Sequence, residues 1–203
     1  MSGYLGRDHE SLLTQVKGLS ELIPGPLSHS KNEIGEFISL AERNIIIGPA
    51  RIVPGERGYL AARNIGQGEL VFSVFGTIIG YQTPVHSIQI GYAVHIDTHD
   101  YGGRYINHHC EGNLRIVWDN RGLHRFVAAK DIARDEEISY SYWRTELLWE
   151  PEVSERLVEC SCGSPNCSGH ILSFSELSCE DRERAFKEGG IAWYLHLGQG
   201  RRR

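Results

Sequence analysis

"RYINHHCEGN", residues 104–113, places an Arg, two Asn, two His and a Cys within ten positions of a chain of 203 residues. A second stretch, "ECSCGSPNC", follows at residues 159–167 and holds three more cysteines: Cys160, Cys162 and Cys167. Structural Zn²⁺ takes four tetrahedral ligands, so this loop is one ligand short. Cys110 is the natural candidate for the fourth, and Cys179 and several histidines are alternatives. A site closed by Cys110 would fasten the later loop onto the earlier segment.

The cysteine count favours a metal site over disulfide bonds. The chain has five cysteines, an odd number. Its first residues, "MSGYLGRDHE", contain no basic region followed by an apolar stretch, so we expect no secretory signal. Disulfide frameworks belong to oxidising compartments and usually use even numbers of cysteines. We therefore expect an intracellular protein with reduced thiols, three of which cluster as metal ligands do.

Composition describes an ordinary globular protein. Apolar residues make up 40% of the chain and charged residues 23%, and the length suits one domain with small appendages. No run approaches the ~20 apolar residues of a membrane span, so we expect no membrane association. The net charge of −5 argues against direct binding of nucleic acid and suits a basic peptide partner.

Hydrophobic periodicity predicts helices at both ends of the chain and short strands between them. Apolar residues recur at helical spacing in three segments: 8–19, 33–43 and 175–188. In the last segment Ser178 resembles an N-cap, and Gly189 ends the helix. Between 45 and 142, short β-prone runs alternate with Gly, Pro, Asn and Asp, which is typical of small antiparallel sheets. No long helical pattern alternates with these runs, which argues against a doubly wound α/β fold.

Four segments together resemble the motifs of SET-domain protein methyltransferases with a post-SET zinc loop, in the family's order. They are "ERGYLAARNIGQGELV" at 56–71, "IDTHDYGGRYINHHCEGN" at 96–113, "RDEEISYSY" at 134–142 and "CSCGSPNCSGHI" at 160–171. The resemblance implies a mostly β (α+β) fold, the SET-type β-clip of small curled sheets. In that fold one strand threads under a loop as a pseudoknot.

The resemblance divides the chain into four parts. They are an N-terminal helical flank at 1–44, the SET domain at 45–145, a linker and post-SET zinc loop at 146–174, and a C-terminal helix with a basic tail at 175–203.

The resemblance also implies the roles of individual residues. Tyr142 falls on the catalytic tyrosine, and Tyr140 falls on a position that narrows the lysine channel and favours transfer of a single methyl group. S-adenosylmethionine is the implied cofactor, and its implied contacts are Arg57, Gly58, Tyr59, Arg104, Tyr105, Asn107, His108, Tyr142 and Ile171. Structural Zn²⁺ is the implied metal, and its implied ligands are Cys110, Cys160, Cys162 and Cys167.

The implied reaction is methyl transfer to the side-chain amine of a lysine in a protein, with a histone tail as one possible substrate. The amine must be neutral to react, whereas free lysine has a pKa of about 10.4. An apolar aromatic channel beside a cationic sulfonium lowers that pKa by desolvation and like-charge repulsion. We therefore expect no dedicated carboxylate base, and the sequence shows none at a recognisable position.

Several positions depart from the family pattern around the substrate channel. The departures are Glu56, Val74, Thr77, His109 and Ser141. Val74 stands where the family has a channel tyrosine. Phe75, Tyr92 or Tyr101 could supply the missing aromatic wall.

Two other functions are compatible with the sequence. A SET module without activity could act as a binding scaffold, which the channel departures favour. The protein could instead be a non-haem iron oxygenase, in which His95 and Asp97 would bind the iron together with His170 or His196 as the third ligand. For the methyltransferase, we expect a lysine-presenting protein as partner. We expect a nuclear, chromatin location in a eukaryote and a cytoplasmic one otherwise.

Overall fold

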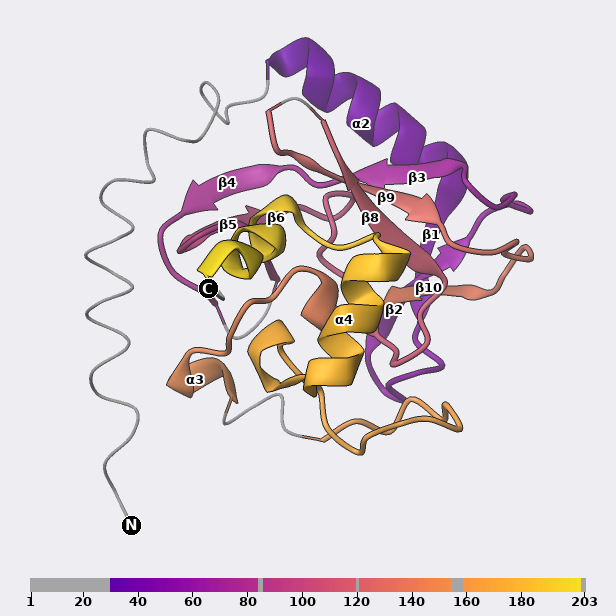
Figure 1. Cartoon of the computed structure of the whole chain (residues 1–203). Coiled ribbons are helices and arrows are strands. Elements are labelled where there is room, and N and C mark those ends of the chain that lie inside the picture. Colours follow the sequence, from indigo (N-terminus) through magenta and orange to yellow (C-terminus); the bar gives the residue numbers. More distant parts are fainter. Residues whose placement is uncertain (1–29, 84–85, 120, 155–158, 202–203) are drawn as a thin grey trace.

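Small β-sheets flanked by short helices make up the protein, as a computed structural model shows (Figure 1). The structure describes residues 30–83, 86–119, 121–154 and 159–201. The helix predicted at 8–19 lies outside the described residues.

Helix α2 (Lys31–Asn44) confirms the helix predicted at 33–43. It begins with a capping box, in which the Ser30 hydroxyl accepts from the Glu33 amide and the Glu33 carboxylate accepts from the Ser30 amide. The side-chain amide of Asn44, the last residue of the helix, donates to the Leu70 and Val71 carbonyls at 3.1 and 2.9 Å. These bonds fasten the helix to strand β3 (Leu70–Ser73).

In the described residues, ten strands form three small sheets, which confirms the predicted fold class. The first sheet has the order β1 (Ile45–Pro49), β2 (Arg57–Ala61), β10 (Glu137–Tyr140), β7 (Asn107–His108). The second has the order β3 (Leu70–Ser73), β9 (His124–Ala128), β8 (Leu114–Trp118). The third has the order β4 (Gly76–Ile79), β6 (Val94–Thr98), β5 (Ser87–Gly91).

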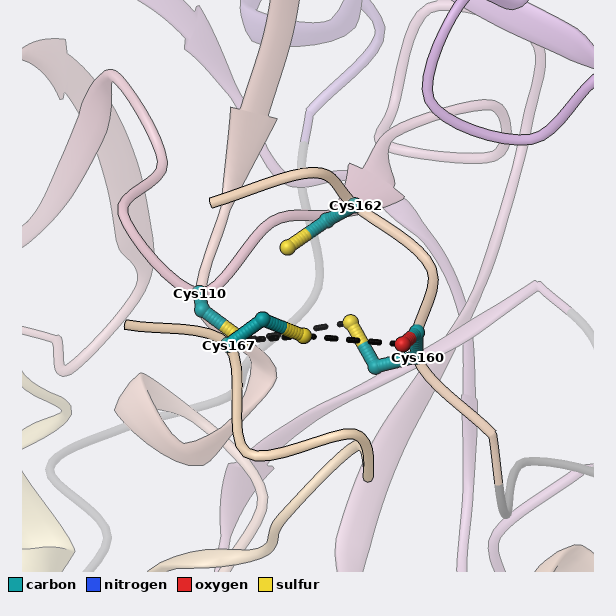
Figure 2. Close-up of side chains that lie close together, drawn as sticks. All are labelled: Cys110, Cys160, Cys162 and Cys167. Carbon is teal, nitrogen blue, oxygen red and sulfur yellow. Dashed lines mark hydrogen bonds between the residues drawn. The ribbon is translucent and has the colours of Figure 1, made fainter. Parts of the chain in front are cut away.

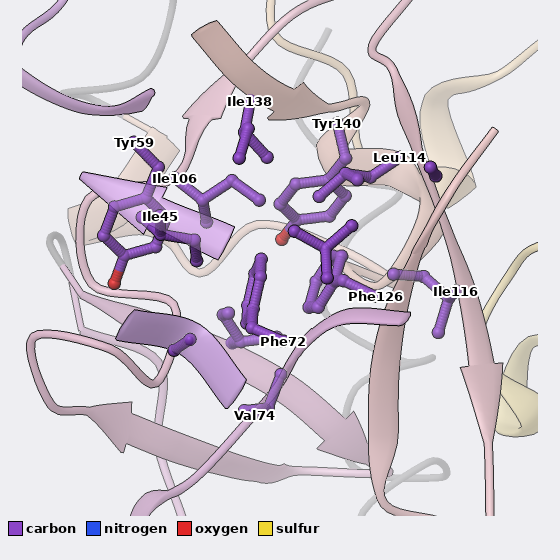
Figure 3. Packing of buried hydrophobic residues seen from close by; sticks show 14 of the residues in the cluster. Ile45, Tyr59, Phe72, Val74, Ile106, Leu114, Ile116, Phe126, Ile138 and Tyr140 are labelled. Atoms are coloured by element: carbon purple, nitrogen blue, oxygen red, sulfur yellow. The ribbon is translucent and has the colours of Figure 1, made fainter. Parts of the chain in front are cut away.

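Aromatic residues hold the centre of the main core (Figure 3). Phe72 and Phe126 stack with ring centroids 4.6 Å apart, and Phe126 meets Tyr140 edge to face at 4.9 Å. Tyr59 meets Phe72 at 5.8 Å. Each fully buried aromatic of this kind stabilises the fold by roughly 1.5–3 kcal/mol. Because these side chains come from different sheets, they join the sheets into one core.

Strand β10 crosses under the segment 107–113. It pairs antiparallel with β2 and parallel with β7. The Asn113 side chain spans the crossing, since its amide donates to the Glu137 carbonyl at 2.9 Å and its oxygen accepts from the Ser139 amide at 3.0 Å. A Cβ added to Gly112 would lie 2.4 Å from the Tyr140 Cα, so the two backbones touch. This crossing is the threaded arrangement that the resemblance implied.

The C-terminal elements form a second apolar cluster. Residues of η1 (Tyr142–Arg144), η2 (Phe174–Glu176), α4 (Cys179–Glu188) and η3 (Trp193–Arg201) belong to it, whereas the short α3 (Pro151–Ser154) contributes none. Tyr194 lies at the centre of the cluster, and its hydroxyl donates to the Thr145 carbonyl and, at 2.9 Å, to the Gln89 carbonyl. These bonds join the C-terminal cluster to the β-sheets.

The predicted helix at 175–188 begins later than expected. Ser178 is the N-cap, as predicted, and its hydroxyl accepts from the Asp181 amide at 3.0 Å. Residues before this cap belong to η2, which has its own cap at Ser173. The helix ends at Gly189, whose φ of 69° lies in the left-handed region. Among the described residues, no helix has the length and apolar character needed to span a membrane.

His124 on β9 is buried with both ring nitrogens lacking a hydrogen-bond partner. Burial lowers its pKa to about 3, whereas an unfolded chain binds a proton near pH 6.5. The folded protein therefore loses stability as the pH falls below 6.5, by at most ~1.4 kcal/mol per pH unit for this residue. We expect His124→Leu to reduce this acid destabilisation, measured as melting temperature between pH 7.5 and 4.5.

The matched control is His99→Leu, which changes an exposed histidine. We expect this variant to keep the wild-type dependence of melting temperature on pH. The same steep acid slope in His124→Leu would show that His124 does not limit stability in acid.

Candidate functional site

A cavity of about 550 Å³ opens beside the crossing of β10 and the 107–113 segment. Most residues expected at the cofactor line it: Arg57, Arg104, Tyr105, Asn107, His108, Tyr142 and Ile171. Tyr140 also lines it. The structure therefore brings together residues from four separate motifs. Gly58 and Tyr59 do not line the cavity, although both were expected at the cofactor.

Tyr59 lies outside the cavity lining and holds one of the loops that form it. Its side chain is fully buried in the core. Its hydroxyl accepts from the Gly103 amide at 3.3 Å and donates to the Asp100 carbonyl. These bonds fix the loop that leads into Arg104 and Tyr105.

Glu137 holds two walls of the cavity together. One carboxylate oxygen accepts from the backbone amides of Arg51 and Ile52 at 2.5 and 2.8 Å. The other accepts from the Asn107 side-chain amide at 2.8 Å. A buried carboxylate must find donors, and here they come from two distant loops. Glu137 thus sets the spacing between the 51–57 loop and β7.

Gly58 permits this close approach. A Cβ at this position would lie 2.7 Å from the Glu137 Oε1 and 3.1 Å from the Asn107 Nδ2. The Asn107 amide also donates to the Arg57 carbonyl at 3.2 Å. Gly58 therefore acts by leaving room for the Asn107–Glu137 pair.

Tyr142 is fixed at both ends. Its hydroxyl donates to the Ile106 carbonyl at 2.8 Å, and its backbone amide donates to the His108 Nδ1 at 3.2 Å. Burial raises its pKa well above the ordinary value, so it stays a neutral phenol. The polar end of Tyr142 therefore lies beside a backbone carbonyl in the cavity wall.

The Tyr140 hydroxyl forms its hydrogen bond with a residue outside strand β10. Its hydroxyl lies 3.0 Å from the Thr145 Oγ1, and burial raises its pKa. Its ring packs on Tyr142 with centroids 5.1 Å apart. The two tyrosines form one continuous aromatic wall.

Trp149 extends the aromatic wall, and the sequence analysis missed it. Its indole N–H donates to the Ile171 carbonyl at 3.1 Å, and its ring meets Tyr142 edge to face at 6.4 Å. Our three candidates for the wall, Phe75, Tyr92 and Tyr101, do not line the cavity. They pack in three other places. Phe75 faces Phe37 of α2, Tyr92 faces Tyr194, and Tyr101 packs on the main core.

The departures from the family pattern fall in different places. Val74 is buried in the core and Thr77 is exposed on β4, and neither lines the cavity. Glu56 lines the cavity from an exposed position. The Ser141 hydroxyl lies within hydrogen-bonding distance of the His109 and Cys110 carbonyls, at 3.0 and 2.7 Å. Ser141 therefore supports the segment that carries Cys110.

Glu146 is the second residue that the sequence analysis missed. It is buried and lines the cavity. Burial raises its pKa to about 7. It follows η1 in a stretch, "WRTELLWEP", that matches no motif, so only the fold reveals it. The expectation that no dedicated carboxylate base is required stays a prediction, and Glu146 is a buried acid in the cavity lining that the sequence did not single out.

Four cysteines meet at the rim of the cavity (Figure 2). The sulfur atoms of Cys110, Cys160, Cys162 and Cys167 all lie within 4.8 Å of one another. Cys110 Sγ lies 3.8 Å from the Sγ atoms of both Cys160 and Cys167. Four thiolates about 2.3 Å from one Zn²⁺ at tetrahedral angles are about 3.8 Å apart. The donor set and its spacing therefore fit zinc.

Cys110 is thus the fourth member of the cluster, as expected from the ligand count. Cys179, an alternative, is exposed on α4 and outside the cluster. The later loop is also held by a bond of 2.6 Å from the Asn166 amide to the Glu111 carboxylate.

The iron site considered above is not assembled. Among the described residues, the four cysteines are the only group of three or more His, Cys, Asp or Glu side chains close enough to share an ion. His95 is buried on β6 and Asp97 is exposed. His196 lies against Trp118 and Phe186 instead.

Comparison with known proteins identifies the fold. Residues 56–143 match the family model described as the SET domain. This range spans β2 to β10 and includes both tyrosines of the aromatic wall. The match places a SET domain in this stretch of the chain.

The similar curated proteins are histone-lysine N-methyltransferases. One from Yarrowia lipolytica, described as H3 lysine-4 specific, is 34% identical over 89 residues, covering 37% of this chain and 6% of the relative. One from Saccharomyces cerevisiae, with the same description, is 40% identical over 81 residues, covering 37% and 7%. Human histone-lysine N-methyltransferase EHMT1 is 29% identical over 103 residues, covering 46% and 8%. This chain thus spans less than a tenth of the length of each of these relatives.

Among solved structures, ctPRC2 in an autoinhibited conformation bound to S-adenosylmethionine matches with a TM-score of 0.43 and 23% identity. The match covers 49% of this chain and 15% of that chain.

We expect the purified protein to hold about one zinc ion per chain and Cys110→Ser to lose it, because one missing thiolate opens the site. Metal analysis by mass spectrometry and the melting temperature measure the effect. Cys179→Ser is the matched control, since this thiol is exposed and outside the cluster. Full metal content in Cys110→Ser would contradict the assignment.

We expect Gly58→Ala to destabilise the protein by about 1–3 kcal/mol, because the added methyl group displaces the Glu137 carboxylate from its donors. Urea unfolding measures the change. Gly35→Ala is the control, since nothing lies within 4 Å of its added Cβ and alanine favours a helix. Equal stability of both variants would rule out the close approach at Gly58.

Proposed function

We propose that this protein transfers a methyl group from S-adenosylmethionine to the side-chain amine of a lysine in a protein. The observation that carries the proposal is the cavity itself. Its lining includes Asn107, which Glu137 holds from outside the lining, and two neutral tyrosines, one of which, Tyr142, donates to the Ile106 carbonyl. The SET domain and the names of the similar proteins support it.

The residues around Asn107 fit a cofactor with a charged amino-acid end and a flat base. Arg57, Arg104 and the Asn107 side chain offer polar atoms along one side of the cavity, and His108, Trp149 and Ile171 offer apolar surface. When bound, S-adenosylmethionine would supply a methyl group on a cationic sulfur. We assign the cofactor contacts to these residues.

Tyr142 would orient the lysine amine. Its phenol is neutral and its proton is directed at the Ile106 carbonyl, so its oxygen lone pairs are available to an amine N–H. The Tyr142 oxygen and the Ile106 carbonyl are held in place by their hydrogen bond. They would stabilise the positive charge that develops on the amine during transfer. Alignment of the amine in a narrow aromatic channel would contribute further to the rate.

The four-cysteine cluster would have no part in the chemistry. All four of its donors are protein thiols, which is typical of a structural zinc site. It would hold the 160–171 loop, and with it Ile171, against the cavity.

The substrate would be a protein with an accessible lysine, and the net charge of −5 suits a basic one such as a histone tail. A nuclear location would follow from a histone substrate. The alternative of an inactive binding module is disfavoured by the presence of both tyrosines and Asn107 in the lining of one cavity.

We expect Tyr142→Phe to slow methyl transfer by about 10²- to 10³-fold, because it removes the oriented oxygen beside the amine. The assay measures label transferred from radioactive S-adenosylmethionine to mixed histones and to a cell lysate. Tyr81→Phe is the matched control, since Tyr81 is exposed and lies outside the cavity. Equal labelling by Tyr142→Phe would remove Tyr142 from this role.

At about pH 10, where much of the lysine is neutral in water, we expect the wild type to add mainly one methyl group and Tyr140→Phe to add further ones, because loss of the hydroxyl widens the channel next to the amine. Mass spectrometry of the methylated peptide gives the product state. Predominant trimethylation by the wild type would contradict a narrowing role for Tyr140.

A further inference from the structure

Glu146 presents a carboxyl group to the cavity from a position without direct access to bulk water. Its Oε1 accepts from the Gln89 backbone amide at 3.0 Å and from the Thr145 hydroxyl at 3.1 Å. Its Oε2 accepts from the Gln82 side-chain amide at 2.7 Å. All three donors are neutral, so the negative charge is solvated by dipoles alone. Such a site makes the carboxyl group a proton acceptor near neutral pH.

The other ionisable groups near this carboxyl leave its charge uncompensated. The His95 Nε2 lies 3.9 Å away, but burial lowers the pKa of His95 to about 4 and keeps it neutral. Tyr140, Tyr142 and Tyr194 face it as neutral phenols. Glu150, a second acid, lies on the other side of Gln82. Its carboxylate accepts from the Gln82 backbone amide, and its own backbone amide donates to the Gln82 side-chain oxygen. No Arg or Lys of the described residues forms an ion pair with Glu146.

Glu146 dictates the direction of a hydrogen-bond chain. The Thr145 hydroxyl has one proton, and an ionised Glu146 can only accept, so Thr145 donates to it. The alternative acceptor of that proton, the Tyr142 carbonyl, is farther away at 3.3 Å and uncharged. Thr145 must then accept from the Tyr140 hydroxyl, 3.0 Å away. The Tyr140 oxygen is left with lone pairs to offer to a group in the cavity.

We propose that Glu146, acting through Thr145, orients the Tyr140 hydroxyl as an acceptor and takes up the proton that the target lysine ammonium must lose. This inference rests on the proposed function. One ammonium N–H bond breaks and its proton binds the Tyr140 oxygen. The Tyr140 proton passes to Thr145, and the Thr145 proton passes to Glu146. The lysine nitrogen keeps the electron pair, and Glu146 ends as a neutral acid.

This relay restores itself after transfer. The methylated amine carries the positive charge that the sulfonium loses, so no further proton is needed for the bond change. When the product leaves, water can enter the cavity and take the proton from Glu146 along the same hydroxyls in reverse. Glu146 and Thr145 are thus positioning residues, because neither needs to touch the substrate.

The test compares Glu146→Gln, Thr145→Val and Thr145→Ser with the wild type. Label transfer from S-adenosylmethionine to mixed histones and a lysate is measured between pH 6.5 and 10. We expect the first two variants to be about 10- to 100-fold slower at pH 7.5 and to approach the wild type near pH 10, where the lysine deprotonates in water. Thr145→Ser keeps the hydroxyl and should keep the wild-type profile.

Glu150→Gln is the matched control. It neutralises an acid bonded to the same Gln82 but outside the chain that leads to Tyr140. We expect its pH profile to follow the wild type.

Infrared titration of the cofactor-free protein gives a readout that does not depend on activity. The wild type and Glu150→Gln should show a carboxylic acid band that titrates near neutral pH, and Glu146→Gln should lack it. Absence of this band from the wild type would overturn the relay.

The outcomes separate this inference from the proposed function. An active wild type whose profile is shared by Glu146→Gln and Thr145→Val would overturn the relay alone. If Glu146→Gln fails to fold, judged by near-ultraviolet circular dichroism and zinc content, the Thr145→Val and Thr145→Ser pair decides. A wild type that labels no lysine in histones or lysate would overturn the proposed function and the relay with it.

Discussion

The site depends on a single buried carboxylate, that of Glu137, which holds two remote parts of the chain at a fixed distance. Its donors lie at Arg51, Ile52 and Asn107, which are 86, 85 and 30 residues away along the sequence. Loss of these donors from a buried carboxylate would cost several kcal/mol of folding free energy. Strand β10, which carries Glu137, therefore packs where all of the donors meet. That position lies between β2 and β7, directly under the 107–113 segment. Tyr140 at the end of the same strand, and Tyr142 at the start of η1 just after it, are thereby placed in the cavity lining.

The sequence predicted those features that depend on residue type and local spacing. The four cysteines could be grouped because zinc needs four ligands and the C-terminal loop offers three. Ser178 could be placed as a cap because capping is a local hydrogen bond. Trp149 and Glu146 could not be placed, because the turn after η1 decides which way they point, and that turn is held by the distant Gln89 and Gln82. Phe75 was placed wrongly for a similar reason. Its ring packs against Phe37 of α2. The hydrophobic pattern of the strands does not reveal how this helix packs.

Burial holds several ionisable groups near Glu146 in their neutral forms. Burial raises the pKa values of Tyr140 and Tyr142 and lowers that of His95. Glu146 differs because burial brings its pKa to about 7, where small changes in surroundings alter its charge. A cationic side chain entering this cavity would find polar oxygens and one adjustable negative charge. No Arg or Lys of the described residues pairs with Glu146, so the region beside this carboxyl favours a cation, whereas Arg57 and Arg104 in the same lining can pair with an anion.

The wall made by the 160–171 loop differs in kind from the rest of the cavity. The other walls belong to strands and to the crossing beneath them, and they are fixed once the core is packed. Besides the bonds that Glu111 and Trp149 make to it, this wall is attached through the four-cysteine cluster, so part of its attachment would follow the supply of metal and the redox state of the thiols. A batch of the protein can therefore be fully folded by any spectroscopic measure of its sheets and still be a mixture of closed and open cavities. Specific activity expressed per milligram would report the metal history of the sample, and only activity expressed per bound zinc would be comparable between laboratories.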